Sequence, residues 1–453
     1  MILERFVSQG LAHYSYLLGD GGHALVIDPR RDCEAYQERA GSLGMRIVHI
    51  LETHRNEDYF VGSAELAART GAQVWHADSQ WGYGYGQPAR PGQRWRIGRL
   101  EVEAISTPGH TPGSMSYLLR DPEGNPWMVF TGDALFAGEV GRVDLLGEEM
   151  AGEMAGMLYE SIFERLLPLG DGIIVCPAHG AGSVCGESIA ERSWTTIGLE
   201  RAHNPRLQLK ERSQFVAAIQ AVRPERPPYF RMMERVNLEG RPLLGRLPSP
   251  PPLSAEEFEE RGRDAQILDT RTETSFGAAH LPGAQSIWQE GLAAFAGWFL
   301  RYDQPLLLVT EAGGVEEATR LLIRLGFDGI EGFLSGGMLG WHMSGRESAS
   351  IRMITVQELC RLLDREEALV LDVRSSGELS SSGTIRGAQH IHLTMLPERM
   401  DEVPRDRTVH IFCGSGLRAM VAASFLKRHG WRDLAVVLGG MAGWRSRRCP
   451  VVR

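Results

Sequence analysis

An internal repeat in the C-terminal half constrains the fold of this 453-residue sequence more than any other feature. Asp269 and Asp372 lie 103 positions apart, and Trp341 and Trp444 have the same separation, so one small unit occurs twice. Three segments recur between the copies: residues 267–271 (ILDTR) as 370–374 (VLDVR), residues 281–284 (LPGA) as 385–388 (IRGA), and residues 336–341 (GGMLGW) as 439–444 (GGMAGW). The chain therefore contains two copies of one domain.

Each copy alternates short apolar runs with helix-like stretches. In the second copy, residues 409–412 (VHIF) predict a buried strand and residues 417–428 predict a helix. This alternation is typical of βαβ units around a mainly parallel sheet. Residues 247–252 (LPSPPP) are expected to form a stiff linker that separates the repeats from the preceding chain. We place the two copies at residues 253–350 and 351–453.

The part before the linker, residues 1–240, is predicted to be one larger domain. Its strand-like runs each lead into a loop with polar or charged residues, which is the usual position of chemistry in layered α/β folds. These runs are residues 24–27, 47–51, 128–130 and 173–176. The complete chain is therefore expected to be a multidomain protein of the α/β and α+β classes.

Composition excludes several classes of function. The net charge of −9 argues against a nucleic-acid partner, which would require a basic surface. No apolar run reaches the ~18–20 residues of a membrane span, and no signal-peptide pattern follows the N-terminal MILER. The six cysteines form no CxxC pair and are too sparse for a disulfide scaffold. We therefore expect a cytoplasmic enzyme without nucleic-acid or membrane partners. A homo-oligomer is a separate expectation that composition does not establish.

Four short motifs of the N-terminal domain carry residue types that bind metals. They are residues 53–59 (THRNEDY), 107–114 (TPGHTPGS), 131–133 (TGD) and 177–180 (PAHG). Together they provide three histidines and two aspartates near predicted strand ends. A single histidine in such a loop would more often be a surface or hydrogen-bonded residue, but all four motifs in this order argue against chance.

The order of these motifs resembles the metallo-β-lactamase superfamily, which implies an αββα sandwich for the N-terminal domain. Within that superfamily, residues 131–136 (TGDALF), 141–145 (GRVDL) and 179–186 (HGAGSVCG) are similar to persulfide dioxygenases. The two C-terminal copies resemble rhodanese α/β domains. Over nearly its full length, the chain is therefore similar to bacterial fusions of a persulfide dioxygenase with a sulfurtransferase.

The resemblance implies one Fe(II) per chain, held by His54, His110 and Asp133. Two histidines and one carboxylate are the donor set of Fe(II) oxygenases, and they leave positions open for O₂ and a thiolate substrate. The usual superfamily motif is His-x-His-x-Asp-His, and this chain has Asn56 and Tyr59 in place of its second and third histidines. Their loss argues against a two-zinc hydrolase.

Four further residues near these motifs have open roles. Asp58 and His179 are expected to orient ligands or bound water from outside, or to form structural hydrogen bonds only. Asn56 either hydrogen-bonds a ligand or a bound oxygen species, or marks a weakened metal site. Cys185, six residues after His179, either lies beside the substrate path or packs in an ordinary loop.

Cys413 is the strongest candidate for a reactive thiol. Residues 413–418 (CGSGLR) follow a predicted strand and precede a helix, so backbone N–H groups and the helix N-terminus favour the thiolate and the persulfide anion. Arg418 adds a fixed positive charge. The pattern resembles the rhodanese active-site loop, and the alternative is a buried apolar cysteine.

The first copy lacks both of these groups. The offset of 103 positions maps Cys413 onto Thr310 and Arg418 onto Val315, and Glu311 would repel anionic persulfides. We predict that this copy is catalytically silent and serves as a spacer or docking domain.

These features predict an iron-dependent persulfide dioxygenase joined to a sulfurtransferase. The metal domain would oxidise the outer sulfur of a low-molecular-weight persulfide to sulfite with O₂, and Cys413 would carry sulfane sulfur for the formation or use of thiosulfate. Two alternatives stay open: a sulfurtransferase whose metal domain has decayed to a scaffold, and a zinc-dependent thioester hydrolase of the glyoxalase II type.

Overall fold

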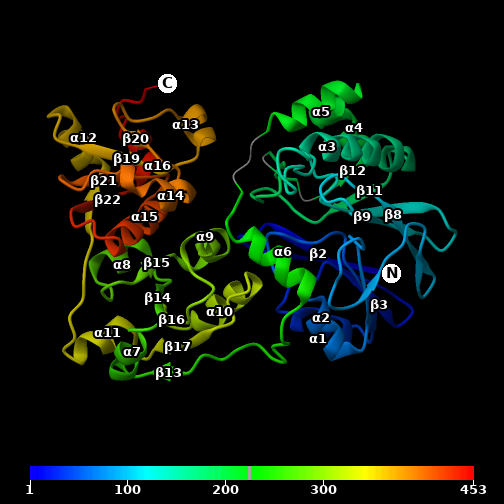
Figure 1. Cartoon of the computed structure of the whole chain (residues 1–453), viewed down its shortest axis with the longest axis horizontal. Coiled ribbons are helices and arrows are strands. Elements are labelled where there is room, and N and C mark those ends of the chain that lie inside the picture. The colour runs from blue at the N-terminus through cyan, green and yellow to red at the C-terminus, as the bar shows by residue number, and fades with distance from the viewer. Residues whose placement is uncertain (187, 193, 223–225, 453) are drawn as a thin grey trace. The chain divides into compact units, whose positions relative to one another are not determined.

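The computed structural model describes residues 1–186, 188–192, 194–222 and 226–452. Two compact units divide the chain (Figure 1). The first comprises Met1–Leu247 with Ile323–Gly326, and the second comprises Pro248–Leu322 with the residues from Phe327 onward. The four motifs with metal-binding residue types lie in the first unit. Residues 413–418, with the candidate thiol, and the matching residues 310–315 of the first copy lie in the second unit. The predicted domain limits at residues 240, 253 and 350 stay predictions.

The first unit contains two six-stranded sheets. The strand order in the first sheet is β1 (Ile2–Ser8), β2 (His13–Asp20), β3 (His23–Ile27), β4 (Arg46–Leu51), β5 (Gln73–His76) and β6 (Gln87–Pro88). The order in the second is β12 (Thr195–Thr196), β11 (Ile174–Pro177), β10 (Pro126–Gly132), β9 (Met115–Arg120), β8 (Leu100–Ser106) and β7 (Arg94–Ile97). The four strands expected from the sequence are present as β3, β4, β10 and β11.

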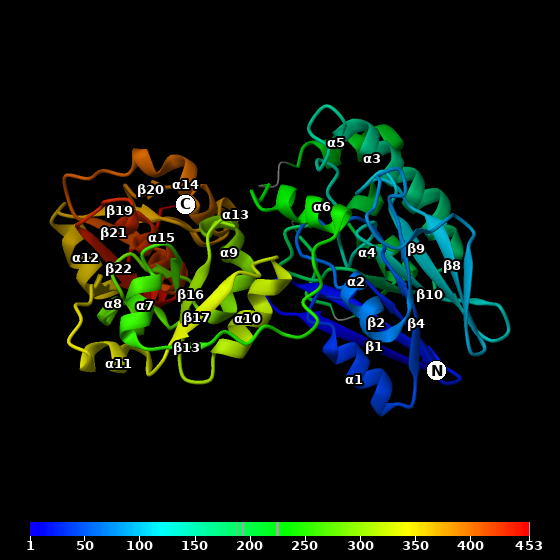
Figure 2. The same cartoon turned by 60° about the horizontal axis from the view of Figure 1, so that its bottom comes forward.

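Helices cover the outer faces of the two sheets, which gives the expected αββα sandwich (Figures 1 and 2). Beside the first sheet lie α1 (Glu34–Ser42) and α2 (Ser63–Thr70). Beside the second lie α3 (Ala151–Glu160), α4 (Ile197–His203) and α5 (Arg212–Gln220). One more helix, α6 (Phe230–Glu239), packs on the loop that follows β4 and contacts it through Asn237.

Apolar side chains explain why these layers form. Leu18 of β2, Leu119 of β9 and Phe130 of β10 are buried together between the sheets. Leu158 of α3 and Val129 of β10 share a second cluster under the helices. Each such side chain contributes roughly 1.5–3 kcal/mol when it is buried. This packing fixes the loops that follow β4, β10 and β11, and those loops carry the polar motifs.

The second unit contains two five-stranded sheets in which all strand pairs are parallel. The order in the first repeat is β13 (Pro252–Leu253), β17 (Ile330–Leu334), β16 (Leu306–Val309), β14 (Gln266–Asp269) and β15 (Gln285–Ser286). The order in the second is β18 (Arg352–Thr355), β22 (Leu434–Leu438), β21 (Val409–Phe412), β19 (Leu369–Asp372) and β20 (Gln389–His390). The orders correspond strand by strand, so the structure confirms the duplication.

The helices of the two repeats also correspond. In the first repeat they are α7 (Ala255–Arg261), α8 (Glu273–Ala278), α9 (Leu292–Phe299), α10 (Val315–Arg324) and α11 (Gly337–Met343). In the second they are α12 (Val356–Asp364), α13 (Ser376–Ser382), α14 (Leu396–Arg399), α15 (Leu417–Arg428) and α16 (Gly440–Ser446).

Helix α15 of the second repeat packs against the edge strand β15 of the first. The side-chain amide of Gln285 donates to Oγ of Ser424 at 2.7 Å, and the backbone N–H of Ser286 donates to the same oxygen at 3.0 Å. The rings of Phe299 and Phe425 lie 5.4 Å apart in the same contact. The two repeats therefore share a buried, hydrogen-bonded interface.

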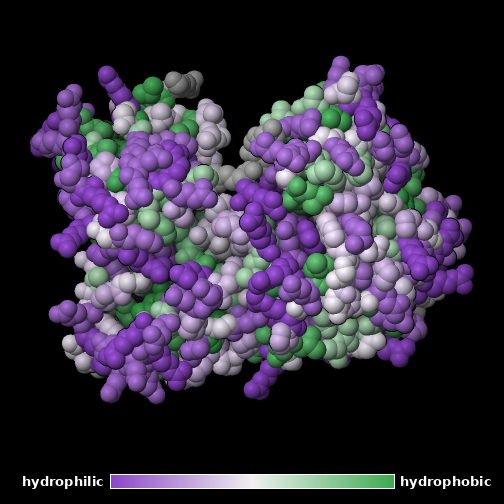
Figure 3. Space-filling model, viewed as in Figure 1, coloured by the Kyte–Doolittle hydropathy of each residue, from purple (hydrophilic) through white to green (hydrophobic). Residues whose placement is uncertain are grey.

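The face shown in Figure 3 is largely hydrophilic, with small separate apolar areas. Among the described helices, none has the length and apolar character needed to cross a membrane.

Candidate metal centre and thiol site

Loops near the ends of strands bring the expected metal-site residues together. His54 follows β4, Asp133 follows β10 and His179 follows β11, while His110 lies between β8 and β9. All four residues are buried. Oδ2 of Asp133 lies 3.5 Å from Nε2 of His110 and 3.8 Å from Nε2 of His54. The three residues predicted to bind iron therefore face a common point.

A chain of hydrogen bonds fixes the orientation of His54. The Thr53 hydroxyl donates to Oδ2 of Asp28 at 2.7 Å, and the Thr53 amide donates to Oδ1 of the same carboxylate at 2.8 Å. Because the hydroxyl proton is used in this way, the Thr53 oxygen accepts from Nδ1 of His54 at 2.8 Å. The neutral ring then carries its proton on Nδ1 and presents the lone pair of Nε2 to the centre.

His110 is held in the same manner. Its Nδ1 lies 3.0 Å from the carbonyl oxygen of Arg142, which can only accept, so Nδ1 donates and Nε2 faces the centre. Next to Asp133, Gly132 has a φ of 53°, and a Cβ at this position would lie 2.7 Å from Cβ of Thr53. Glycine therefore permits the sharp turn after β10 that directs Asp133 towards the histidines.

His179 links two carboxylates behind the centre. Its Nδ1 lies 2.7 Å from Oδ1 of Asp133, and its Nε2 lies 2.9 Å from Oδ2 of Asp58. Burial disfavours the charged ring, but the two carboxylates raise the pKa of His179 well above its usual value. Burial would raise the pKa of Asp133, yet the histidines around it lower that pKa. This is the geometry of outer groups that orient a metal ligand.

Asn56 and Tyr59 bond to the backbone. The Asn56 amide donates to the carbonyl oxygen of His54 at 3.3 Å, and the Tyr59 hydroxyl donates to the carbonyl oxygen of Asp28 at 3.3 Å. Asn237 of α6 holds this loop, because its amide donates to the carbonyl oxygens of Asn56 at 2.7 Å and Tyr59 at 2.8 Å. The loop therefore has no histidine for a second metal beyond His54.

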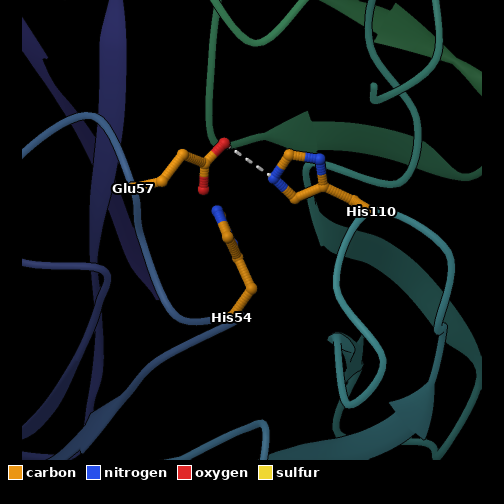
Figure 4. A group of neighbouring side chains, drawn as sticks. All are labelled: His54, Glu57 and His110. Atoms are coloured by element: carbon orange, nitrogen blue, oxygen red, sulfur yellow. Dashed lines mark ion pairs between the residues drawn. The ribbon is translucent and has the colours of Figure 1, made fainter. Parts of the chain in front are cut away.

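Glu57 is a buried carboxylate at the centre that the sequence analysis did not single out (Figure 4). Its Oε1 lies 3.1 Å from Nε2 of His110, without the alignment of a hydrogen bond. Burial raises the pKa of Glu57, but the charge of His110 outweighs burial and lowers this pKa to about 2. Burial likewise lowers the pKa of His110, while Glu57 raises it to about 9. The sequence offered one signal for Glu57. It is a carboxylate directly after Asn56, the position at which the superfamily motif has a histidine.

Cys185 reaches the same centre from the loop after β11. Its thiol donates to Oε1 of Glu57 at 3.5 Å. Cys185, Asp58 and His179 have possible ligand atoms within 4.8 Å of one another. Burial raises the pKa of Cys185 well above its usual value, and the nearby carboxylates raise it further. The structure therefore brings Cys185 beside the site as a protonated thiol.

The atoms that face the centre fit a bound cation. Four of them are buried and make no hydrogen bond with any described residue: Nε2 of His54, Nε2 of His110, Oδ2 of Asp133 and Oε2 of Glu57. Buried polar atoms are normally satisfied, so four such atoms around one point indicate a ligand. Two imidazoles together with carboxylates suit a divalent transition metal such as ferrous iron.

In the second repeat, Cys413 lies directly after β21. The backbone N–H of Gly416 donates to Sγ of Cys413 at 3.1 Å. The carbonyl oxygen of Cys413 accepts from the backbone N–H of Met441 at 2.9 Å, and a Cβ on Gly440 would lie 2.3 Å from that oxygen. The start of α16 thus packs closely on the carbonyl side of the loop, while at least one N–H group points to the thiol.

Arg418, the predicted cation of the thiol loop, forms a two-point ion pair with Glu378, with N–O distances of 2.7 Å and 2.6 Å. Burial alone would raise the pKa of Glu378, but the ion pair outweighs burial and lowers it to about 2. The charge of Arg418 is therefore largely balanced by Glu378. Glu378 was also missed by the sequence analysis, because it lies 40 positions away from Arg418.

The matching loop of the first repeat has different groups. Thr310 follows β16, and its hydroxyl donates to the carbonyl oxygen of Glu311 at 2.9 Å. The Glu311 carboxylate accepts from the hydroxyl of Ser275 at 3.1 Å. Residues 310–315 contain neither a thiol nor a cation. This loop has no nucleophile for sulfur transfer.

Comparison with known families assigns each part of the chain. The description "Metallo-beta-lactamase superfamily" matches residues 9–179, and the description "Rhodanese-like domain" matches residues 254–344 and 355–447. The mitochondrial persulfide dioxygenase ETHE1 of Bos taurus is 30% identical over 228 residues, which are 46% of this chain and 77% of that protein. A sulfurtransferase of Allochromatium vinosum is 35% identical over 92 residues, which are 20% of this chain and 85% of that protein.

A solved structure extends the likeness beyond the metal domain. The metallo-beta-lactamase from Staphylococcus aureus subsp. aureus COL is 28% identical to this chain, with a TM-score of 0.66. The match covers 74% of this chain and 98% of that one. Because 74% exceeds the share of the metal domain, the common architecture includes part of the repeats.

Proposed function

Because this chain belongs to the persulfide dioxygenase family of the metallo-β-lactamase superfamily and continues into two rhodanese-like domains, we propose that it oxidises a low-molecular-weight persulfide and transfers sulfane sulfur through Cys413. The first reaction converts a persulfide, O₂ and water into a thiol, sulfite and two protons. The second joins sulfane sulfur to sulfite and gives thiosulfate, or runs in reverse.

The observation that carries the proposal is that metal-binding atoms of His54, His110 and Asp133 face one point and make no hydrogen bond with any described residue. These residues would hold one Fe(II), which supplies the redox chemistry by which O₂ reacts with a persulfide. The hydrogen bonds to Nδ1 of both rings keep the two Nε2 atoms directed at the metal. His179 uses Oδ1 of Asp133 and so leaves Oδ2 for the metal.

In the second repeat, the Cys413 thiolate would attack the outer sulfur of a persulfide. A new S–S bond forms at Cys413, the donor S–S bond breaks, and the donor leaves as a thiol. Sulfite then attacks the outer sulfur of the Cys413 persulfide, so thiosulfate leaves and the thiolate returns. The N–H of Gly416 lies within hydrogen-bond distance of Sγ and stabilises its negative charge. Arg418 lies in the first turn of α15, directly after this loop, and can attract anionic substrates.

Two alternative functions make different demands on the metal centre. A two-zinc thioester hydrolase needs histidines where Asn56 and Tyr59 bond to the backbone. A domain that had lost its metal and served only as a scaffold would not need to keep four buried polar atoms without hydrogen bonds. Metal analysis of the full chain, purified without added metal, separates the three functions. Our proposal requires one iron per chain, the scaffold requires no metal, and the hydrolase requires two zinc ions.

The variant His110→Ala provides the functional test. It removes one ligand, so both bound iron and persulfide-dependent O₂ uptake should fall to background. The control is His342→Ala, which changes an exposed histidine of α11 and should retain both. Full O₂ uptake by His110→Ala protein without iron would contradict the proposal.

A further inference from the structure

Glu57 is a buried carboxylate to which the proposed function gives no role. Its side chain is fully shielded from solvent, and Oε2 makes no hydrogen bond with any described residue. A carboxylate that is removed from water requires a donor or a cation to offset the loss of hydration. Its Oε1 lies 3.1 Å from Nε2 of His110, an atom that also faces the metal centre.

The distances around the centre are close to those between ligands of one ion. Ligand atoms about 2.1 Å from a metal, at right angles to each other, lie about 3 Å apart. Oε1 of Glu57 lies 3.1 Å from Nε2 of His110, and Oδ2 of Asp133 lies 3.5 Å from the same nitrogen. Potential ligand atoms of His54, Glu57 and His110 all lie within 4.8 Å of one another. Figure 4 shows the carboxylate and both rings directed into one space.

We propose that Glu57 is a fourth protein ligand of the metal and replaces the histidine that is absent at position 56. The inference rests on the proposed metal site of His54, His110 and Asp133. The Asn56 amide is bonded to the backbone of His54, whereas the longer side chain of the next residue reaches the centre. Glu57 thus restores one of the two lost donors and changes its chemistry from nitrogen to oxygen.

This change of donor affects which metal is bound and how many sites stay open. The carboxylates of Glu57 and Asp133 together balance the charge of a divalent ion. An oxygen-richer set favours hard ions such as Fe(II) or Mn(II) over soft ones. Four protein ligands on a six-coordinate ion leave two positions, which is sufficient for one O₂ and one persulfide sulfur.

Cys185 is the competing candidate for this fourth position. Its thiol donates to Oε1 of Glu57 at 3.5 Å, and Glu57, Asp133 and Cys185 have possible ligand atoms within 4.8 Å of one another. A cysteine ligand would have to be a thiolate, which the Co(II) spectrum distinguishes from a carboxylate.

The test is a titration of the metal-free full chain with Co(II), followed by visible absorption and by equilibrium dialysis. Glu57→Gln keeps the size of the side chain but removes its charge, and Glu57→Asp keeps the charge on a side chain one methylene shorter. Glu57→Gln should bind Co(II) at least about 100-fold more weakly than the wild type, the upper end of losses caused by outer groups. Its visible spectrum should change, because one ligand is exchanged for water or a weaker amide. Glu57→Asp should bind with intermediate affinity.

Glu52→Gln is the matched control. Glu52 is another buried glutamate of the same domain, and its Oε1 accepts from the Tyr85 hydroxyl at 2.8 Å. Because Glu52→Gln keeps the size of a side chain that bonds to Tyr85, Co(II) affinity and spectrum should match those of the wild type.

Each outcome of the titration has a defined meaning. Wild-type affinity and an unchanged spectrum for Glu57→Gln would overturn the inference but leave the three-residue metal site intact. Weaker binding with an unchanged spectrum would also overturn it, because Glu57 would then act only by orienting His110. An intense near-ultraviolet thiolate band in the wild-type Co(II) protein would assign the fourth position to Cys185 and overturn it too. If the wild type binds no Co(II), or if His110→Ala binds as well as the wild type, the proposed function fails together with the inference.

Discussion

The two repeats share a scaffold and differ at one loop. In both, an Asp–Arg pair at the end of a central strand is buried: Asp269 with Arg271, and Asp372 with Arg374. The Nε–Oδ1 distance is 2.9 Å and the Nη2–Oδ2 distance is 2.6 Å in each pair. These pairs fix the same part of the fold in the copy without the thiol and in the thiol-bearing copy.

At the thiol loop, three matched positions change together. The second repeat has Cys413, Arg418 and Glu378, and the first repeat has Thr310, Val315 and Ser275 at the equivalent positions. The nucleophile, the cation and the partner of that cation are thus all absent from the first copy. The difference teaches that the buried Asp–Arg pair is common to both scaffolds, whereas the Arg–Glu pair occurs only in the copy that carries the thiol.

The largest expected effect comes from removing the Cys413 thiol. It should distinguish the thiol loop of the second repeat from the matching loop of the first. Cys413→Ser should lower thiosulfate formation by the full chain at least about 1,000-fold, as removal of a covalent nucleophile does in other enzymes. Persulfide-dependent O₂ uptake should persist, and sulfite should accumulate. Thr310→Ser, the matched change in the first repeat, should alter neither activity.

Mass spectrometry checks the same prediction without turnover. After exposure to a sulfane donor, wild-type protein should gain about 32 Da on the peptide that contains Cys413, and the Cys413→Ser protein should not. Wild-type rates of thiosulfate formation in the variant would exclude Cys413 as the carrier and make Cys185 the leading candidate.

A second prediction concerns what the repeats share. Asp269→Asn and Asp372→Asn should each lower the free energy of unfolding by about 3–5 kcal/mol, because a buried arginine loses its counter-charge in both cases. The exposed pair of Asp303 with Arg301 offers a control, since Asp303→Asn should cost less than about 1 kcal/mol. Chemical denaturation of the full chain measures all three. Strongly unequal losses for the first two variants would show that the scaffolds are not equivalent.

The smallest expected effect is a pH-dependent change in the free energy of unfolding that arises from the second repeat only. The folded-state pKa of Glu378 is about 2, below its usual value of 4.5, so its pair with Arg418 stabilises the fold above about pH 4.5. This contribution is lost as the pH falls from 4.5 towards 2. Because both side chains are partly exposed, it should amount to less than about 1 kcal/mol.

Denaturation of the wild type and Glu378→Gln at several pH values between 6 and 3 measures this contribution as a difference that shrinks with acidity. Ser275→Ala in the first repeat should show no such trend. A constant difference across the range would show that the ion pair does not lower the pKa of Glu378 in the folded protein.

The sequence predicted the features that follow from strand order and periodicity. The repeated DxR and GGMxGW segments predicted two matching parallel sheets, which the strand orders confirm. His54, Asp133 and His179 lie within three residues of the ends of β4, β10 and β11, so their proximity could be expected. Resemblance to persulfide dioxygenases and rhodaneses was confirmed by the family matches.

Contacts that depend on the reach of single side chains could not be predicted. Glu57 has no strand or periodic pattern of its own, and only the packed loop directs it towards His110. Asn237 holds that loop from a helix 181 positions away from Asn56. Glu378 meets Arg418 because helix α13 faces the thiol loop, a relation that no local pattern of the sequence encodes.

The contact of helix α15 with the first repeat affects how the two repeats depend on each other. The helix starts at the thiol loop and, through Ser424, occupies the polar groups of the edge strand β15 in the first repeat. Cutting the chain between the repeats would expose a strand edge on one side and an apolar helix face on the other, and exposed strand edges promote aggregation. We therefore expect each copy to depend on the other for solubility, so the first copy can contribute to the protein without a thiol of its own.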